Sequence, residues 1–110
     1  MKKFVVLYHA SPEAMAKMAE ATEAEKVEGM KPWLAWKDAL GNKLVDFGAP
    51  LTSGTRLLPD GSTEMSKKDV AGYSMIQASD MEEAKALLKD HPHLKWTGGC
   101  DIEVHECVPM

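Results

Sequence analysis

Several residues that can bind metals or transfer protons lie close together near the C-terminal end of the chain. Residues 89–107 have the sequence KDHPHLKWTGGCDIEVHEC, and their potential ligands are His91, His93, His105, Cys100 and Cys107. Imidazole and thiolate are preferred zinc ligands, and an imidazole that titrates near neutral pH can also act as a general acid or base. The residue types in this segment are therefore compatible with two functions, metal binding and histidine catalysis.

The spacing of these residues does not favour a metal site. A proline separates His91 from His93, and Cys100 stands alone, whereas zinc sites usually take close pairs of ligands. His105 and Cys107 are two positions apart on a predicted strand and share a face, but a third ligand would require a loop folded back over that face. We therefore predict no metal and no other cofactor.

His91 and His9 are the candidate catalytic residues. His91 falls on the sheet-facing side of the helix that precedes it, where it either lines a cleft as an acid or base or, when protonated, interacts with the helix dipole as a structural residue. His9 ends the first predicted strand, directly before a helix start that favours anions. The alternative for His9 is a polar residue that simply leaves the core.

Trp33, Trp36 and Lys37 are the candidate substrate-binding residues. The two tryptophans lie on the apolar arc of a predicted helix, where they either fill the core or form a wall for a flat apolar compound. Lys37 falls inside the same arc. Its stem either lies along apolar surface with the ammonium in solvent, or directs a cation into a cleft between helix and sheet.

Length and composition predict one globular domain over residues 1–110, because 45% of the residues are apolar and 27% are charged. A net charge of −4 without a basic stripe argues against a nucleic-acid partner. The apolar run at residues 4–8 is too short for a secretion signal, and no stretch approaches the roughly 20 apolar residues of a membrane helix. We therefore expect a cytoplasmic protein with no membrane partner.

Four strands and two helical regions are predicted to position the candidate residues. The strands are expected over residues 2–10, 43–51, 70–78 and 100–108, with a hairpin at 52–66 that turns at Pro59-Asp60-Gly61. The first helical region begins at Ser11-Pro12, is interrupted at Gly29 and restarts at Pro32. The second begins at Ser79 or Asp80 and must end by His91, since Pro92 follows.

This order of elements, β-α-β-β-α-β, predicts a ferredoxin-like α+β fold with an antiparallel sheet. Two helical regions cover only one face of such a sheet, yet the first strand is apolar on both faces. A second copy of the chain is the simplest cover for the other face. We therefore predict a homodimer whose sheets pack face to face, which is a dimeric α+β barrel.

The whole chain resembles the YCII-related (YciI-like, DGPF-type) family. The segments that carry the resemblance are FGAPL at 47–51, TRLLPDGS at 55–62, AGYSMIQASDMEEAKALLKDHPHL at 71–94 and IEVHECVPM at 102–110. It implies the same dimeric α+β barrel. It also implies activity without a cofactor, through a His–Asp pair in a cleft, on small and often aromatic or chlorinated compounds.

The chain departs from this family pattern at the catalytic pair. The family histidine lies on the first helix, but this chain has no histidine between His9 and His91, and Trp33 and Trp36 occupy the aligned region. The D-G-P-F string is replaced by EMSKKDVAGY. The pair therefore cannot be carried over to this sequence.

The sequence thus predicts a protein that binds an unknown small molecule. As an enzyme, it would use a cleft histidine, without a cofactor, on a small aromatic or carbonyl compound. One alternative is a non-catalytic binding or interaction module whose dimer is the functional unit. A second, weaker alternative is a barrel similar to cofactorless monooxygenases.

Overall fold

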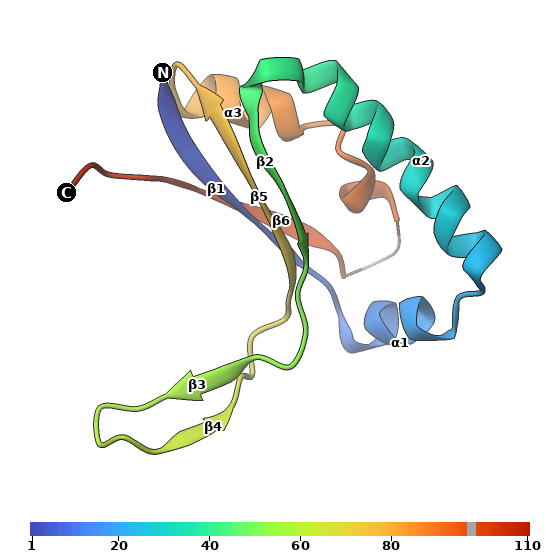
Figure 1. Ribbon diagram of the computed structural model, residues 1–110, viewed down its shortest axis with the longest axis vertical. Helices are drawn as coiled ribbons and strands as arrows, with labels where there is room; N and C mark the ends of the chain where they lie inside the picture. The colour runs from blue at the N-terminus through green and yellow to red at the C-terminus, as the bar shows by residue number, and fades with distance from the viewer. Residues whose placement is uncertain (97–98) are drawn as a thin grey trace.

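A four-stranded antiparallel sheet forms the centre of the protein (Figure 1). The computed structural model describes residues 1–96 and 99–110. In sheet order, the strands are β2 (Leu44–Pro50), β5 (Val70–Ala78), β1 (Lys2–His9) and β6 (Asp101–Glu106). This order is that of a ferredoxin-like βαββαβ fold, so the predicted fold class is confirmed.

Strand β1 lies between β5 and β6 and separates the two faces of the sheet. Phe4, Val6 and Tyr8 point to the helix side and are buried, as expected for alternate residues of a central strand. Val5 and Leu7 point to the opposite side and are only half-buried. We call this second side the open face; its members include Val5, Leu7, His9, Tyr73, Met75, Glu103 and His105.

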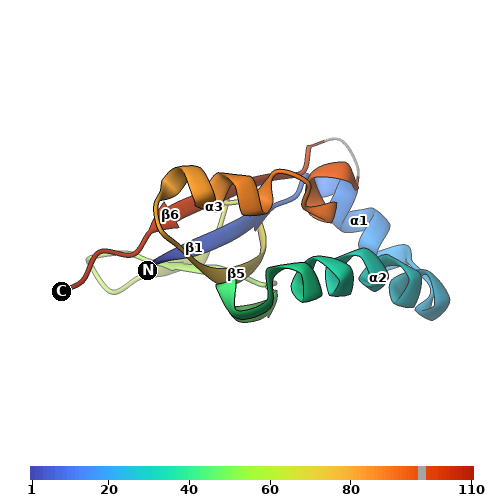
Figure 2. The same cartoon turned by 90° about the horizontal axis from the view of Figure 1, so that it is seen from above.

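Three helices cover the other side. They are α1 (Pro12–Glu20), α2 (Glu23–Leu40) and α3 (Met81–Leu88), with short 3-10 turns η1 (Gly41–Lys43) and η2 (Pro92–Lys95). Trp36 and Leu40 of α2 and Leu88 of α3 pack in one core with β1. Seen from above, the C-terminal end of α2 lies near α3 and the rest of α2 extends past it (Figure 2). Within the described part of the chain, no helix combines the length and the apolar character that a membrane span requires.

The break between the first two helices lies at Ala21-Thr22, so the predicted interruption at Gly29 is wrong. Thr22 forms a capping box with Glu25, in which each side chain accepts the other's backbone N–H at 3.1 Å. Helix α2 then runs through Gly29 and Pro32. It tolerates the proline because Pro32 is exposed there, so water can replace the missing backbone hydrogen bond.

Strands β3 (Thr55–Leu57) and β4 (Thr63–Met65) form the predicted hairpin. In Figure 1 it projects beyond the sheet, on the side away from α2. Its turn is closed by a 2.9 Å bond from Leu58 N to Ser62 O, and the Asp60 carboxylate accepts the Ser62 N–H at 2.8 Å. Gly61 takes the positive φ of 89° that this turn requires.

Candidate functional site

His91 lies at the centre of an aromatic cluster made of Tyr8, Trp33, Trp36, His91 and His93, in which Trp33 is partly buried and the other four are buried. Its ring centroid is 4.5 Å from that of Trp33, 4.4 Å from that of Trp36 and 5.0 Å from that of Tyr8. The His91 side chain is completely buried. Trp36 is fixed in turn, because its indole N–H donates to the carbonyl oxygen of Leu87 at 3.0 Å. The aromatic cluster therefore packs α2 and η2 against the sheet.

Burial makes His91 a neutral side chain. Loss of water, and secondarily the charge of His93, lowers the His91 pKa to about 3. Its Nδ1 accepts the backbone N–H of His93 at 3.0 Å, so the single ring proton of the neutral imidazole is on Nε2. The interpretation of His91 as a protonated residue at a helix end is therefore wrong. Its buried Nε2–H has no hydrogen-bond partner within the described residues.

A chain of hydrogen bonds runs from the aromatic cluster to β2. Ser74 donates its only hydroxyl proton to the carbonyl oxygen of Phe47 at 2.6 Å, so it accepts the Tyr8 hydroxyl proton at 2.7 Å. Burial raises the pKa of Tyr8 to about 12, although the bond to Ser74 offsets part of this effect. Tyr8 therefore keeps its proton and acts as a hydrogen-bond donor within the core.

His93 connects the aromatic cluster to the end of β1. Its Nε2 donates to the backbone carbonyl oxygen of His9 at 2.7 Å, and only 4% of the residue is exposed. The register of β1 against β5 is irregular between Tyr8 and His9, at the same point. In the sequence, His93 was a candidate only as a metal ligand, and this contact with β1 was not predicted. The available signal was Pro92, which begins a helical turn and places His93 one residue inside it.

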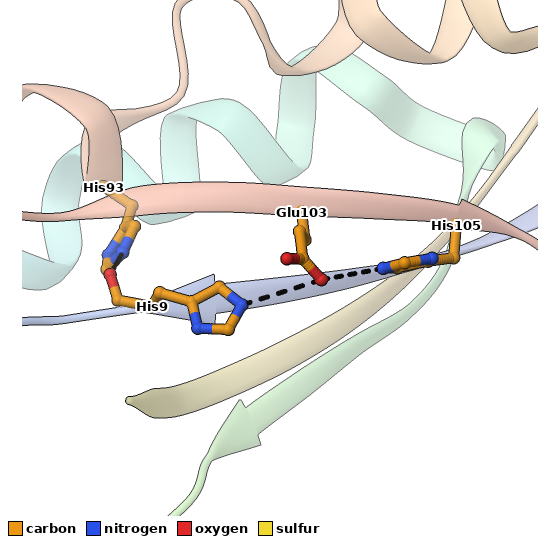
Figure 3. Close-up of polar contacts among 4 residues, drawn as sticks. All are labelled: His9, His93, Glu103 and His105. Carbon is orange, nitrogen blue, oxygen red and sulfur yellow. Dashed lines mark hydrogen bonds and ion pairs between the residues drawn. The ribbon is translucent and has the colours of Figure 1, made fainter. Parts of the chain in front are cut away.

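On the opposite side of the sheet, His9, Glu103 and His105 form a row (Figure 3). One carboxylate oxygen, Glu103 Oε1, lies 2.8 Å from His105 Nε2 and 3.9 Å from His9 Nε2. His9 Nε2 is buried and has no hydrogen-bond partner within the described residues. The hydrogen bond from His105, together with the charges of His9, His105 and Lys68, lowers the pKa of Glu103.

A carboxylate between two imidazoles suits proton transfer. The negative charge of Glu103 stabilises the protonated form of either ring, which is the form that a histidine adopts after it has accepted a proton. In the sequence, His105 was grouped with Cys107, and Glu103 was not identified as a candidate. The missed signal is the alternation along β6, which places residues 103 and 105 on one face.

The structure brings together some of the predicted site residues and separates others. Trp33, Trp36 and His91 are in contact, and the Lys37 ammonium lies 5.5 Å from the centre of the Phe47 ring next to them. The His9 side chain is on the open face and does not join this group. Both cysteines are free, and the described residues contain no group of three or more His, Cys, Asp or Glu that could hold a metal.

Comparisons with known proteins agree with this fold. A solved structure of 5-chloro-2-hydroxyhydroquinone dehydrochlorinase from Burkholderia phenoliruptrix AC1100, in complex with 2,5-dihydroxybenzoquinone, is similar with a TM-score of 0.53. The alignment covers 92% of this chain and 90% of that chain at 16% identity, and it shows a shared fold. Curated protein sequences gave no match. The YCII-related domain matches residues 3–107. The chain therefore belongs to the YCII-related family, which confirms the resemblance seen in the sequence.

Proposed function

We propose that this chain binds a small aromatic or carbonyl compound and acts on it as a cofactor-independent acid/base enzyme, with His9 as the group that transfers the proton. One observation carries the proposal: the buried Nε2 of His9 lacks a hydrogen-bond partner among the described residues and faces the Glu103 carboxylate at 3.9 Å. The structurally similar dehydrochlorinase was solved with a quinone, which is a carbonyl compound of the proposed kind.

The proposed chemistry is a single proton transfer. Glu103 stabilises a proton on His9 Nε2, which leaves Nδ1 to take a proton from a phenol hydroxyl or from a carbon next to a carbonyl. The electron pair of the broken bond remains on the substrate as a phenolate or enolate. The proton then returns to the same substrate atom or to another one. His105, hydrogen-bonded to the same carboxylate oxygen, holds Glu103 in place.

The proposed enzyme is a homodimer of a single domain. Val5, Leu7 and Met75 form a half-buried apolar centre on the open face, next to the row of His9, Glu103 and His105. A second copy packed on this face would exclude water from the row and so strengthen its electrostatic interactions. Light scattering should then give about twice the 12.1 kDa of one chain. A mass of one chain at micromolar concentration rejects the dimer.

The cleft that was predicted between the Trp33–Trp36 helix and the sheet, which we call the inner site, remains a second location for the ligand. His91, Trp33 and Trp36 fill the space between α2 and the sheet with their own rings, so a ligand must displace at least one of them. The neutral His91 offers an Nε2–H that can donate to a carbonyl oxygen. Lys37 is exposed and beside Phe47, where it can pair with an acidic substrate group.

The test of the enzyme measures proton exchange directly. Acetophenone and other small aromatic ketones are incubated with the protein in D2O, and NMR follows the replacement of hydrogen by deuterium next to the carbonyl. Since a positioned acid or base contributes about 100-fold or more, His9→Asn should reduce the exchange rate by at least that factor. Glu103→Gln should reduce it as well.

Glu106→Gln is the matched control, because Glu106 is a carboxylate on the same strand whose ion pair is with Lys2. This variant should exchange at the normal rate. Exchange no faster than in buffer across the ketone set, or equal rates for His9→Asn and the unmodified protein, rejects the enzymatic proposal.

The second candidate is a non-catalytic dimeric binding or interaction module. The packing of the aromatic cluster favours it, because the rings of His91, Trp33 and Trp36 contact one another and leave the predicted inner site filled. This candidate predicts that the dimer forms while the unmodified protein shows no exchange.

A further inference from the structure

We propose that a groove at the base of the β3–β4 hairpin binds the anionic group of a small aromatic ligand. The groove has a volume of about 530 Å³, which is within the range of small-molecule sites. Its lining residues are Thr55, Arg56, Glu64, Ser66, Lys67 and Lys68. This inference names a ligand class for the site described above, and in that sense it rests on the proposed function.

Positive charge is concentrated in this groove although the whole chain carries a net charge of −4. The Arg56 guanidinium is paired with Glu64 at 2.8 Å, which leaves no unpaired acid among the lining residues. Lys67 and Lys68 form no ion pair with any described residue. Two ammonium groups that make no direct ion pair favour an anion between them, with the strength expected of partly exposed charges.

The groove adjoins the row of histidines on the open face. Ala10, which follows His9, donates its backbone N–H to the carbonyl oxygen of Asp69 at 2.9 Å, and Val70 is paired with His9 in the sheet. Lys68 therefore lies beside the end of β1. Its charge also acts on Glu103, since it contributes to the lowered pKa of that carboxyl. A ligand held by the lysines can therefore extend toward His9.

The chemistry of the lining residues defines the ligand. Lysine ammonium groups bind carboxylates and phenolates as point charges, and the hydroxyls of Thr55 and Ser66 can donate hydrogen bonds to the same oxygens. The end of the ligand that reaches His9 must carry an exchangeable proton. These requirements describe an aromatic carboxylate, or an ionised hydroxyquinone, with a hydroxyl at its other end.

Two isosteric probes test the anion preference. Binding of 4-hydroxybenzoate and of its neutral amide, 4-hydroxybenzamide, is measured by calorimetry at low ionic strength. The carboxylate should bind more tightly, and the double variant Lys67→Gln/Lys68→Gln should weaken its binding by about fivefold while leaving the amide unchanged, as expected for exposed charge pairs. Added salt should reproduce the loss.

Lys85→Gln/Lys89→Gln is the matched control, because these lysines line a different groove, of about 250 Å³, between α3 and β6. It should bind 4-hydroxybenzoate normally. Calorimetry measures binding and not proton exchange, so a preference for the acid over the amide can be observed even where no exchange is detected, which separates the groove from the catalytic proposal. Equal binding of acid and amide, no detectable binding of the acid, or equal losses in the two lysine pairs overturns the inference.

Discussion

The His93 ring donates a 2.7 Å hydrogen bond to the backbone carbonyl of His9, so a buried side chain on the helix side holds the strand end that presents His9 on the opposite side. This bond therefore connects the aromatic cluster on the helix side with the row of His9, Glu103 and His105 on the open face, although the two groups share no side chain. His91 continues the connection inward, because its Nδ1 accepts the backbone N–H of His93. A change in the aromatic cluster is expected to reach the open face through this path.

Removing the His93 bond should lower stability. His93→Phe keeps the ring but removes the donor that the carbonyl of His9 uses on the helix side, and the net loss of a hydrogen bond costs about 0.5–1.5 kcal/mol in the free energy of unfolding. Urea denaturation measures the change. His105→Gln, at an exposed position, should alter stability by no more than about 0.5 kcal/mol. If both variants lose the same amount, the His93 bond is not the cause.

Acid should destabilise the protein through His91. Its pKa is lowered from 6.5 to about 3 in the folded state, so between these values the unfolded chain binds the additional proton. The stabilisation is fully present above pH 6.5 and is lost as the pH falls toward 3, by about 1.4 kcal/mol per pH unit. Denaturation between about pH 6 and 5 isolates this contribution from most carboxyl groups.

His91→Asn supplies the comparison, because an asparagine oxygen can still accept the backbone N–H of His93 while the side chain does not titrate. The variant should be less stable near neutral pH but should show a smaller loss between pH 6 and 5. Parallel stability curves for the two proteins would assign the acid sensitivity to other groups.

Ser74 should be more costly to remove than the Tyr8 hydroxyl. Ser74→Ala leaves both the Tyr8 hydroxyl and the Phe47 carbonyl without a partner, whereas Tyr8→Phe removes a donor and leaves Ser74 bonded to Phe47. We expect a loss of about 2–4 kcal/mol for the first variant and about 1 kcal/mol for the second. Thermal and urea denaturation measure both. The double variant should lose less than the sum of the two, because each change removes part of the same chain.

The carboxyl of Glu103 should titrate at higher pH when His105 is replaced. Its pKa lies below the ordinary value of 4.5, chiefly because His105 donates a hydrogen bond to it. His105→Asn should therefore raise the pKa of Glu103, as followed by the carbon chemical shift of the carboxyl. Lys68→Gln should raise it by a smaller amount. An unchanged titration in His105→Asn contradicts the hydrogen bond.

Local sequence signals predicted most of the fold. Strand β5 occupies residues 70–78 as expected, because its ends are marked by turn residues and its interior is apolar, and α3 begins after Asp80 as its capping pattern indicated. The break in the first helical region was misplaced because the low helix propensity of Gly29 and Pro32 is only a weak guide to where a helix ends. In the folded protein, the capping box at Thr22 decides the boundary.

The candidate site was less predictable for a physical reason. The partners of His9 and His93 come from opposite ends of the chain, and sequence spacing carries no information on such contacts. His91 was correctly placed against the sheet, but its surroundings depend on how Trp33 and Trp36 pack, and that packing determines its protonation. The charge state of a buried histidine therefore follows from tertiary structure.

Helix α2 has two halves with unequal support. Trp36 and Leu40 anchor its C-terminal half in the core, whereas residues 23–32 are exposed throughout, including Val27 with 61% of its surface in solvent, and extend beyond the sheet (Figure 1). A helix segment with little packing against the core opens at low free-energy cost. Amide hydrogen exchange should therefore be fast up to Lys31 and slow from Trp36 onward. This difference in stability between the two halves makes the first half of α2 a region that can unfold and refold around a partner while the aromatic cluster stays packed.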